Sequence, residues 1–84
     1  MDIRESIRSY ILAEFLPGED PANLEDTTPL IASGILDSLA TMRLVGFIEE
    51  EFSVEIGPHE TDPEYIGTID SIERLVRSKL DGAR

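Results

Sequence analysis

The chain enters its central predicted helix through residues 33–39, SGILDSL, which run directly into the apolar-striped segment 40–52, ATMRLVGFIEEEF. Gly34 can adopt backbone angles that other residues avoid, so we expect the chain to turn there. Asp37 then places a carboxylate at the positive amino end of the helix, and Ser38 follows with its hydroxyl directed outward. The unpaired amide groups and the dipole at such a helix start favour an anion, so phosphate chemistry suits this serine.

The helix that starts at Ser38 is predicted to run to Phe52 and to bury one side. Its core stripe consists of Leu44, Phe47, Ile48 and Phe52, which recur at helical spacing. Leu39, Met42 and Val45 widen the apolar arc beyond what a simple core face requires. We therefore expect Leu39 and Met42 to be partly exposed near Ser38, where a methionine suits a surface that accepts several partners.

An amphipathic helix is predicted before this stretch and is joined to it by a long loop. The helix begins at Asp2, with Glu5 three residues later, and ends at about Leu16. Its apolar positions are Ile3, Ile7, Tyr10, Ile11 and Phe15. The loop 18–37 is rich in small, polar and acidic residues, and its length is unusual enough to suggest a function. We expect it to be ordered because apolar residues anchor it, namely Leu24, Leu30, Ile31, Ile35 and Leu36.

Two helices are predicted after the central one. Asp62-Pro63 reads as a cap followed by proline at the first helical position, and Gly67 stops this short third helix. Thr68 caps the last helix, whose apolar positions are Ile69, Ile72, Leu75, Val76 and Leu80. The sequence thus predicts an all-α fold, a four-helix bundle with a long first loop and a short third helix, formed by a single domain of residues 1–84.

The charge of the chain excludes several classes of partner. Eighteen acidic and seven basic residues give a net charge of −11, which argues against binding to nucleic acids or anionic membranes and favours basic protein surfaces. No apolar run approaches the roughly 20 residues that cross a bilayer, and no secretion signal is evident, so we expect a cytoplasmic protein. The chain has no cysteine, and its acidic loop lacks the alternation and the central glycine of a calcium loop, so no metal site is predicted.

Ser38 is the candidate functional residue, and three roles compete for it. A serine at a helix start often serves only as a cap. A serine hydrolase would need a base, yet the only histidine is His59, in a loop that we expect at the surface, and no Gly-x-Ser-x-Gly elbow is present. A chain of 84 residues is also small for an enclosed active site. The third role is that of an acceptor for a group that another enzyme transfers, and the residues alone leave the cap and the acceptor open.

At Asp37-Ser38-Leu39 the chain resembles acyl carrier proteins, including the peptidyl and aminoacyl carriers. The resemblance extends to Gly34-Ile35-Leu36, to Glu49-Glu50-Glu51-Phe52 and to Thr68-Ile69-Asp70-Ser71-Ile72, and so covers nearly the whole chain. It implies that Ser38 takes the 4'-phosphopantetheine arm of coenzyme A as a phosphodiester, and that the thiol of the arm holds an acyl or aminoacyl group as a thioester. It also implies that Asp37 helps a transferase and its magnesium ion to meet the serine.

The resemblance implies a covalent carrier with no catalytic activity of its own. Its partners would be a phosphopantetheinyl transferase, an acyl- or amino-acid-activating ligase, and condensing or tailoring enzymes. We expect a monomer, which suits a shuttle, and docking that is weak and salt-sensitive. The residues that we expect to recognise partners are Asp37, Leu39, Met42, Arg43 and Gly46.

The chain departs from the pattern of many fatty-acid carriers, which have acidic residues where it has Ala40 and Arg43. Arg43 has no carboxylate three or four residues away, so we expect it to meet an acidic or polar spot on a partner or to steady the phosphate of the arm, unless it is simply solvated. Gly46 costs about 1 kcal/mol relative to alanine, which implies close packing or a bulky neighbour.

These departures favour a carrier in specialised biosynthesis of the polyketide or nonribosomal peptide type. A fatty-acid synthase acyl carrier protein is one alternative. An alternative of another class is an acidic helical adaptor that binds a protein partner through Leu39, Met42 and Gly46 and carries no prosthetic group.

Overall fold

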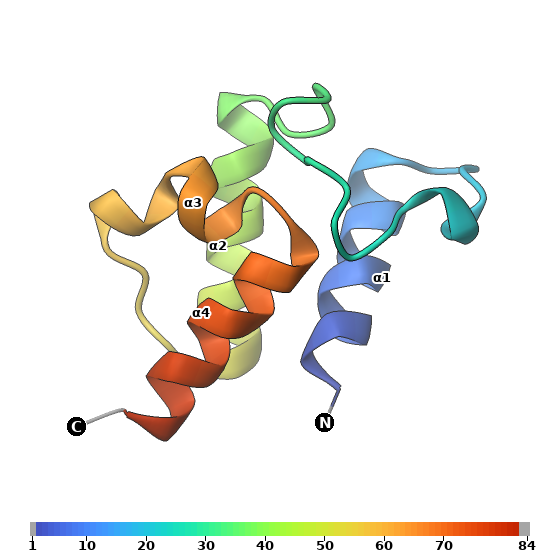
Figure 1. The fold of residues 1–84 in the computed structure, drawn as a ribbon. Coiled ribbons are helices and arrows are strands. Elements are labelled where there is room, and N and C mark those ends of the chain that lie inside the picture. Colours follow the sequence, from blue (N-terminus) through green and yellow to red (C-terminus); the bar gives the residue numbers. More distant parts are fainter. Residues whose placement is uncertain (1, 83–84) are drawn as a thin grey trace.

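A computed structural model describes residues 2–82 of the chain as a bundle of helices (Figure 1). The elements, in chain order, are α1 (Ile3–Phe15), η1 (Pro21–Asn23), α2 (Ser38–Phe52), η2 (Pro58–Thr61), α3 (Pro63–Ile66) and α4 (Ile69–Asp81). The predicted four-helix bundle with a long first loop and a short third helix is confirmed. The two short 3₁₀ helices, η1 and η2, were not predicted. Within residues 2–82 there is no strand, and no helix there is long and apolar enough to span a membrane.

Local hydrogen bonds start α1 and α4 where the sequence indicates. The side chain of Asp2 accepts a hydrogen bond from the Glu5 N–H at 3.2 Å, and that of Thr68 accepts one from the Ser71 N–H at 3.0 Å. Such caps satisfy amide groups that have no partner inside the helix. The predicted cap at Asp62 is only half right, because the residue precedes α3 but its side chain makes no capping hydrogen bond.

A single apolar core joins all four helices and the first loop. Its fully covered members include Ile7 and Ile11 of α1, Leu44 and Ile48 of α2, Ile66 of α3, and Ile69, Ile72 and Val76 of α4. Aromatic rings close the side between α1 and α2, where Tyr10 stacks on Phe47 with ring centroids 4.1 Å apart. The prediction that Leu80 extends the core stripe of α4 is wrong, because 46% of it is exposed. Leu80 lies in the last turn of α4, beside an open groove.

The first loop, residues 16–37, is tied to the rest of the bundle at several points. Leu24, Leu30 and Leu36 are buried as predicted, whereas Ile31 and Ile35 are half-buried. The N–H of Leu30 donates to the Gly67 carbonyl at 2.7 Å. Arg4 of α1 bridges the loop to α4 by pairing with Asp26, Asp70 and Glu73, each at 2.6 Å. The carboxylate of Asp26 therefore helps to hold the first loop against α1.

Gly67 lies where the first loop meets the junction between α3 and α4. A Cβ atom at this position would come 2.3 Å from the Pro63 carbonyl oxygen, which is backbone and cannot move alone. We expect Gly67→Ala to lower the free energy of unfolding by roughly 1–3 kcal/mol, because the added methyl pushes α3 away from its site. Urea denaturation followed by circular dichroism measures this. Gly46→Ala is the control, because a Cβ there would meet no atom within 4 Å and alanine favours a helix.

Candidate functional site

The site is built around the start of α2. Asp37 is the N-cap, and its Oδ1 accepts a hydrogen bond from the Ala40 N–H at 2.8 Å. Ser38 is the first residue inside the helix and is exposed. The role of helix cap that competed for Ser38 therefore belongs to its neighbour, and the serine hydroxyl is not needed for capping.

The end of the first loop fixes the position of this helix start. Gly34 has a φ of +87°, so the predicted turn is confirmed at a backbone conformation that favours glycine. The N–H of Leu36 then donates to the Leu30 carbonyl at 2.9 Å, and the Leu36 side chain is only 2% exposed. A buried leucine directly before the exposed pair Asp37 and Ser38 anchors the chain on one side and presents the two polar residues on the other.

Ser38 opens onto a surface hollow of about 540 Å³ between the first loop, α2 and the start of α3. Figure 1 shows these three segments at the same end of the bundle. The hollow is lined by Ile31, Leu36, Asp37, Ser38, Thr41, Met42, Thr61 and Pro63. Its lining is thus largely apolar, with three hydroxyl groups and the carboxylate of Asp37. Such a lining suits a flexible chain that carries both methylene and amide groups.

The predicted partner-recognition residues fall into two sets. Asp37 and Met42 line the hollow beside Ser38. Leu39 and Gly46 lie on the exposed side of α2, and Leu39 and Met42 are 70% and 60% exposed, as expected. The expectation that Gly46 makes room for close packing or a bulky neighbour is wrong within the fold, because the space around it is open. The glycine leaves a flat place on α2 one turn beyond Met42.

Arg43 is exposed, yet it has a partner that the sequence did not reveal. Its Nη2 lies 3.1 Å from Glu14 Oε1 of α1, and its guanidinium lies 5.8 Å from the centre of the Phe15 ring. The hydroxyl of Tyr10 donates to the Arg43 carbonyl at 3.2 Å. The alternative of a simply solvated Arg43 is therefore wrong, because Glu14 pairs with it, while its contact with a partner or with the phosphate of the arm stays a prediction.

Asp37 combines a structural role with a charge, and two substitutions separate them. Asp37→Ala removes the cap and should lower the free energy of unfolding by about 0.5–2 kcal/mol. Asp37→Asn keeps a capping oxygen and loses only the charge, so it should cost a few tenths of a kcal/mol. Thermal denaturation of both variants measures the difference, and equal losses would contradict the capping role.

Other candidate groups stand apart from the site. His59 is exposed, as expected, with its ring edge-on to Tyr65 at 6.3 Å. Within residues 2–82 no group of three or more histidine, cysteine or acidic side chains is arranged to hold a metal ion. Sequence reasoning did not place Thr61 and Pro63 beside Ser38, since they join it only through the packing of α3 against the bundle.

Comparisons with known proteins agree with this geometry. A family model described as a phosphopantetheine attachment site matches residues 10–76. The acyl carrier protein PigG of Serratia sp., described as probable, is 35% identical over 75 residues, which is 89% of this chain and 85% of that protein. The mitochondrial acyl carrier protein of Neurospora crassa is 35% identical over 73 residues, covering 87% of this chain and 53% of that protein.

A solved structure is similar as well. It is described as the crystal structure of an FAD-dependent dehydrogenase, and one of its chains superposes with a TM-score of 0.74 and 32% sequence identity. The match covers 82% of this chain and 96% of that chain.

Proposed function

The chain belongs to the acyl carrier protein family with a phosphopantetheine attachment site, and from that premise we propose that it carries an acyl or aminoacyl intermediate on a 4'-phosphopantetheine arm bound to Ser38. The observation that carries the proposal is the position of Ser38. It is exposed at the first residue of α2, free of the capping role, and it opens onto the hollow. Its hydroxyl can therefore be reached by another enzyme without disturbing the helix.

The attachment reaction uses the serine as a nucleophile. Ser38 Oγ forms a phosphodiester with the phosphate that bears pantetheine, the pyrophosphate bond of coenzyme A breaks, and adenosine bisphosphate leaves. The hydroxyl proton passes to a base of the transferase. We further propose that the carboxylate of Asp37, which is exposed beside Ser38, meets the transferase and its magnesium ion. Once bound, the arm supplies a thiol that holds the intermediate as a thioester.

The chain itself contributes position and not catalysis. Covalent attachment raises the local concentration of the intermediate at each partner enzyme, so capture becomes a docking event. Leu36 and the cap at Asp37 fix where the arm leaves the protein, and Thr41, Met42 and Thr61 offer surface along which it can lie. The exposed residues Leu39, Met42 and Gly46 provide a contact area on α2.

The charge distribution favours basic docking surfaces on the partners. Each Lys and Arg of residues 2–82 already pairs with a carboxylate of the chain, namely Arg4, Arg8, Arg43, Arg74, Arg77 and Lys79. These cations are therefore engaged within the chain, and the excess of carboxylates gives the net charge of −11 that a basic partner surface would meet. Docking through exposed charges is screened by salt, which helps a monomeric carrier in the cytoplasm to leave each partner after its turn.

We place the carrier in specialised biosynthesis of the polyketide or nonribosomal peptide type. Arg43 paired with Glu14 and the apolar Leu39 and Met42 give α2 a less acidic face than a row of carboxylates would. A role in fatty-acid synthesis is the second candidate, favoured by the similarity to a mitochondrial acyl carrier protein. Among tailoring partners, an FAD-dependent dehydrogenase is supported by the description of the similar crystal structure.

The proposal is tested by the intact mass of the purified protein after incubation with coenzyme A, magnesium and a broad-specificity phosphopantetheinyl transferase. A gain of one phosphopantetheine group is the expected result. If two different transferases leave the mass of the folded protein unchanged, the carrier function is wrong, and an acidic adaptor without a prosthetic group becomes the better explanation.

A further inference from the structure

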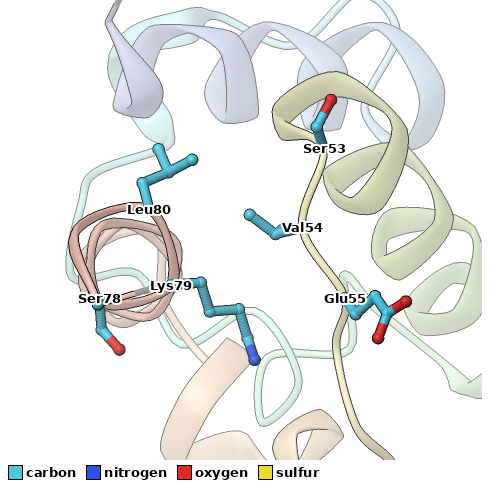
Figure 2. A pocket seen from close by; sticks show the side chains of 7 residues that line it. Ser53, Val54, Glu55, Ser78, Lys79 and Leu80 are labelled. Atoms are coloured by element: carbon cyan, nitrogen blue, oxygen red, sulfur yellow. The ribbon is translucent and has the colours of Figure 1, made fainter. Parts of the chain in front are cut away.

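The connection between α2 and α3, residues 53–62, stands away from α4 across an open groove (Figure 2). The groove has a volume of about 720 Å³ and is lined by Ser53, Val54 and Glu55 of the connection and by Ser78, Lys79, Leu80 and Gly82 on the other side. Figure 2 shows Val54 and Leu80 directed into this space from opposite walls, and Lys79 reaching away from Leu80. Val54 and Ile56 of the connection are half-buried and pack against the core, while the groove separates the connection from the last turn of α4.

Polar side chains also hold the connection. Glu49 of α2 accepts a hydrogen bond from the Ile56 N–H at 2.9 Å. Further along, Lys79 Nζ of α4 lies 2.8 Å from Glu60 Oε1, and the same oxygen accepts a hydrogen bond from the Gly57 N–H at 2.8 Å. The side chains of Lys79 and Glu60 are only 22% and 16% exposed. This ion pair therefore ties η2 directly to α4.

The Glu60–Lys79 ion pair lies next to the hollow beside Ser38. Glu60 belongs to η2, and the next residue, Thr61, lines the hollow together with Pro63, which begins α3. Thr61 Oγ1 donates to the Pro58 carbonyl at 2.8 Å, which links the last residue of η2 to the first. Met42 and Thr41 of α2 line the same hollow. A shift of η2 therefore changes the width of the hollow beside Ser38.

We propose that the Glu60–Lys79 ion pair is a clasp that positions η2 and thereby sets the shape of the hollow beside Ser38. Both members are positioning residues, because neither of them lines the hollow itself. The inference rests on the proposed function only in the use of the hollow by the arm. The clasp itself is a property of the unmodified protein and can be measured there.

The charges around Glu60 give the clasp a defined dependence on pH. The groups that face it are Lys79 from α4 and His59 from its own segment. The hydrogen bond to Lys79, followed by that to the Gly57 N–H, lowers the pKa of Glu60 below its ordinary value of 4.5. A carboxyl with a lowered pKa in the folded state contributes stability above its ordinary value, and this contribution is lost as the pH falls through the lowered pKa. The ion pair is therefore expected to persist at neutral pH and to weaken only in acid.

The test compares Lys79→Met, which keeps much of the side-chain length and removes the charge, with Lys79→Arg, which restores the charge. Arg77→Met is the matched control, because Arg77 pairs with Glu73 at 3.2 Å on the same helix and is not among the residues that line the groove. NMR of the unmodified protein follows the Met42 methyl signal and the exchange of the Glu60 amide, which donates to the Gly57 carbonyl at 2.9 Å.

We expect Lys79→Met to speed exchange of the Glu60 amide by roughly two- to fivefold and to shift the Met42 methyl signal. Lys79→Arg should restore both, and Arg77→Met should change neither. Faster exchange with an unchanged Met42 signal would overturn the proposal, because η2 would then be held without shaping the hollow. So would unchanged exchange.

If Lys79→Met fails to fold, Glu60→Gln decides the question, because it removes the charge from the other member of the pair. It should shift the Met42 methyl signal together with the signals of η2, and a shift of the η2 signals alone would contradict the clasp. Because the signals belong to the unmodified protein, failure of the clasp is distinguishable from failure of the carrier function, which the mass of the modified protein reports.

Discussion

Ser38→Ala is expected to abolish the mass gain that the wild-type protein shows with coenzyme A, magnesium and a phosphopantetheinyl transferase. The phosphodiester needs the serine oxygen, so the loss should be complete and not partial. The substitution should leave the fold intact, because Asp37 and not Ser38 caps α2, and Ser38 is exposed. We expect a change in the free energy of unfolding within about 0.5 kcal/mol.

Ser33→Ala is the matched control for this experiment. Ser33 is also an exposed serine and lies five residues before Ser38, near the end of the first loop. We expect Ser33→Ala to be modified as fully as the wild type. Full modification of Ser38→Ala would show that another hydroxyl is the acceptor. If both variants lost modification, the loop and not the hydroxyl would be the determinant, which would contradict the assignment of Ser38.

Leu44→Ala should lower the stability of the fold more than Gly67→Ala or Asp37→Ala does. Leu44 lies on the inner side of α2, is fully buried, and belongs to the core that joins the helices. Truncation of a buried leucine costs about 2–5 kcal/mol through lost burial and the cavity left behind. A domain of this size is stable by on the order of 4–13 kcal/mol, so the substitution should remove a large share of the total free energy of unfolding.

The same substitution on the outer side of the helix provides the control. Leu39 is 70% exposed, so Leu39→Ala should change the free energy of unfolding by less than about 0.5 kcal/mol. Thermal denaturation separates the two variants, since each kcal/mol corresponds to roughly 4–8 °C in Tm for a domain of this length. Similar losses at the two positions would mean that α2 does not turn Leu44 inward and Leu39 outward.

The features that depend on neighbouring residues could be predicted from the sequence. The bounds of α2, the turn at Gly34 and the cap at Thr68 follow from local backbone preferences and short-range hydrogen bonds, and the structure confirms each of them. The exposure of Leu39 and Met42 also follows from helical periodicity, because the apolar arc of α2 is wider than its buried face. The assignment of Ser38 as the attachment point stays a prediction until its modification is measured.

The features that depend on contacts through space could not be predicted. Arg43 meets Glu14 from a residue 29 positions away, and no local spacing rule relates the two. Thr61 reaches the hollow beside Ser38 because η2 and α3 fold back over the bundle. Leu80 keeps the helical period of its neighbours, yet it is exposed because the core does not extend to the last turn of α4. Periodicity identifies one side of a helix but not how far along it the core continues.

Because Asp37 caps α2 and Ser38 does not, the structure bears on how partners distinguish the unmodified protein from the modified one. The residue that caps α2 is not the residue that we propose to be modified, so a change at the serine oxygen leaves the cap in place. Molecules with and without an arm should then share the same capped start of α2. We expect a partner enzyme to distinguish them by contact with the arm and its cargo, because the helix cap is the same in all of them.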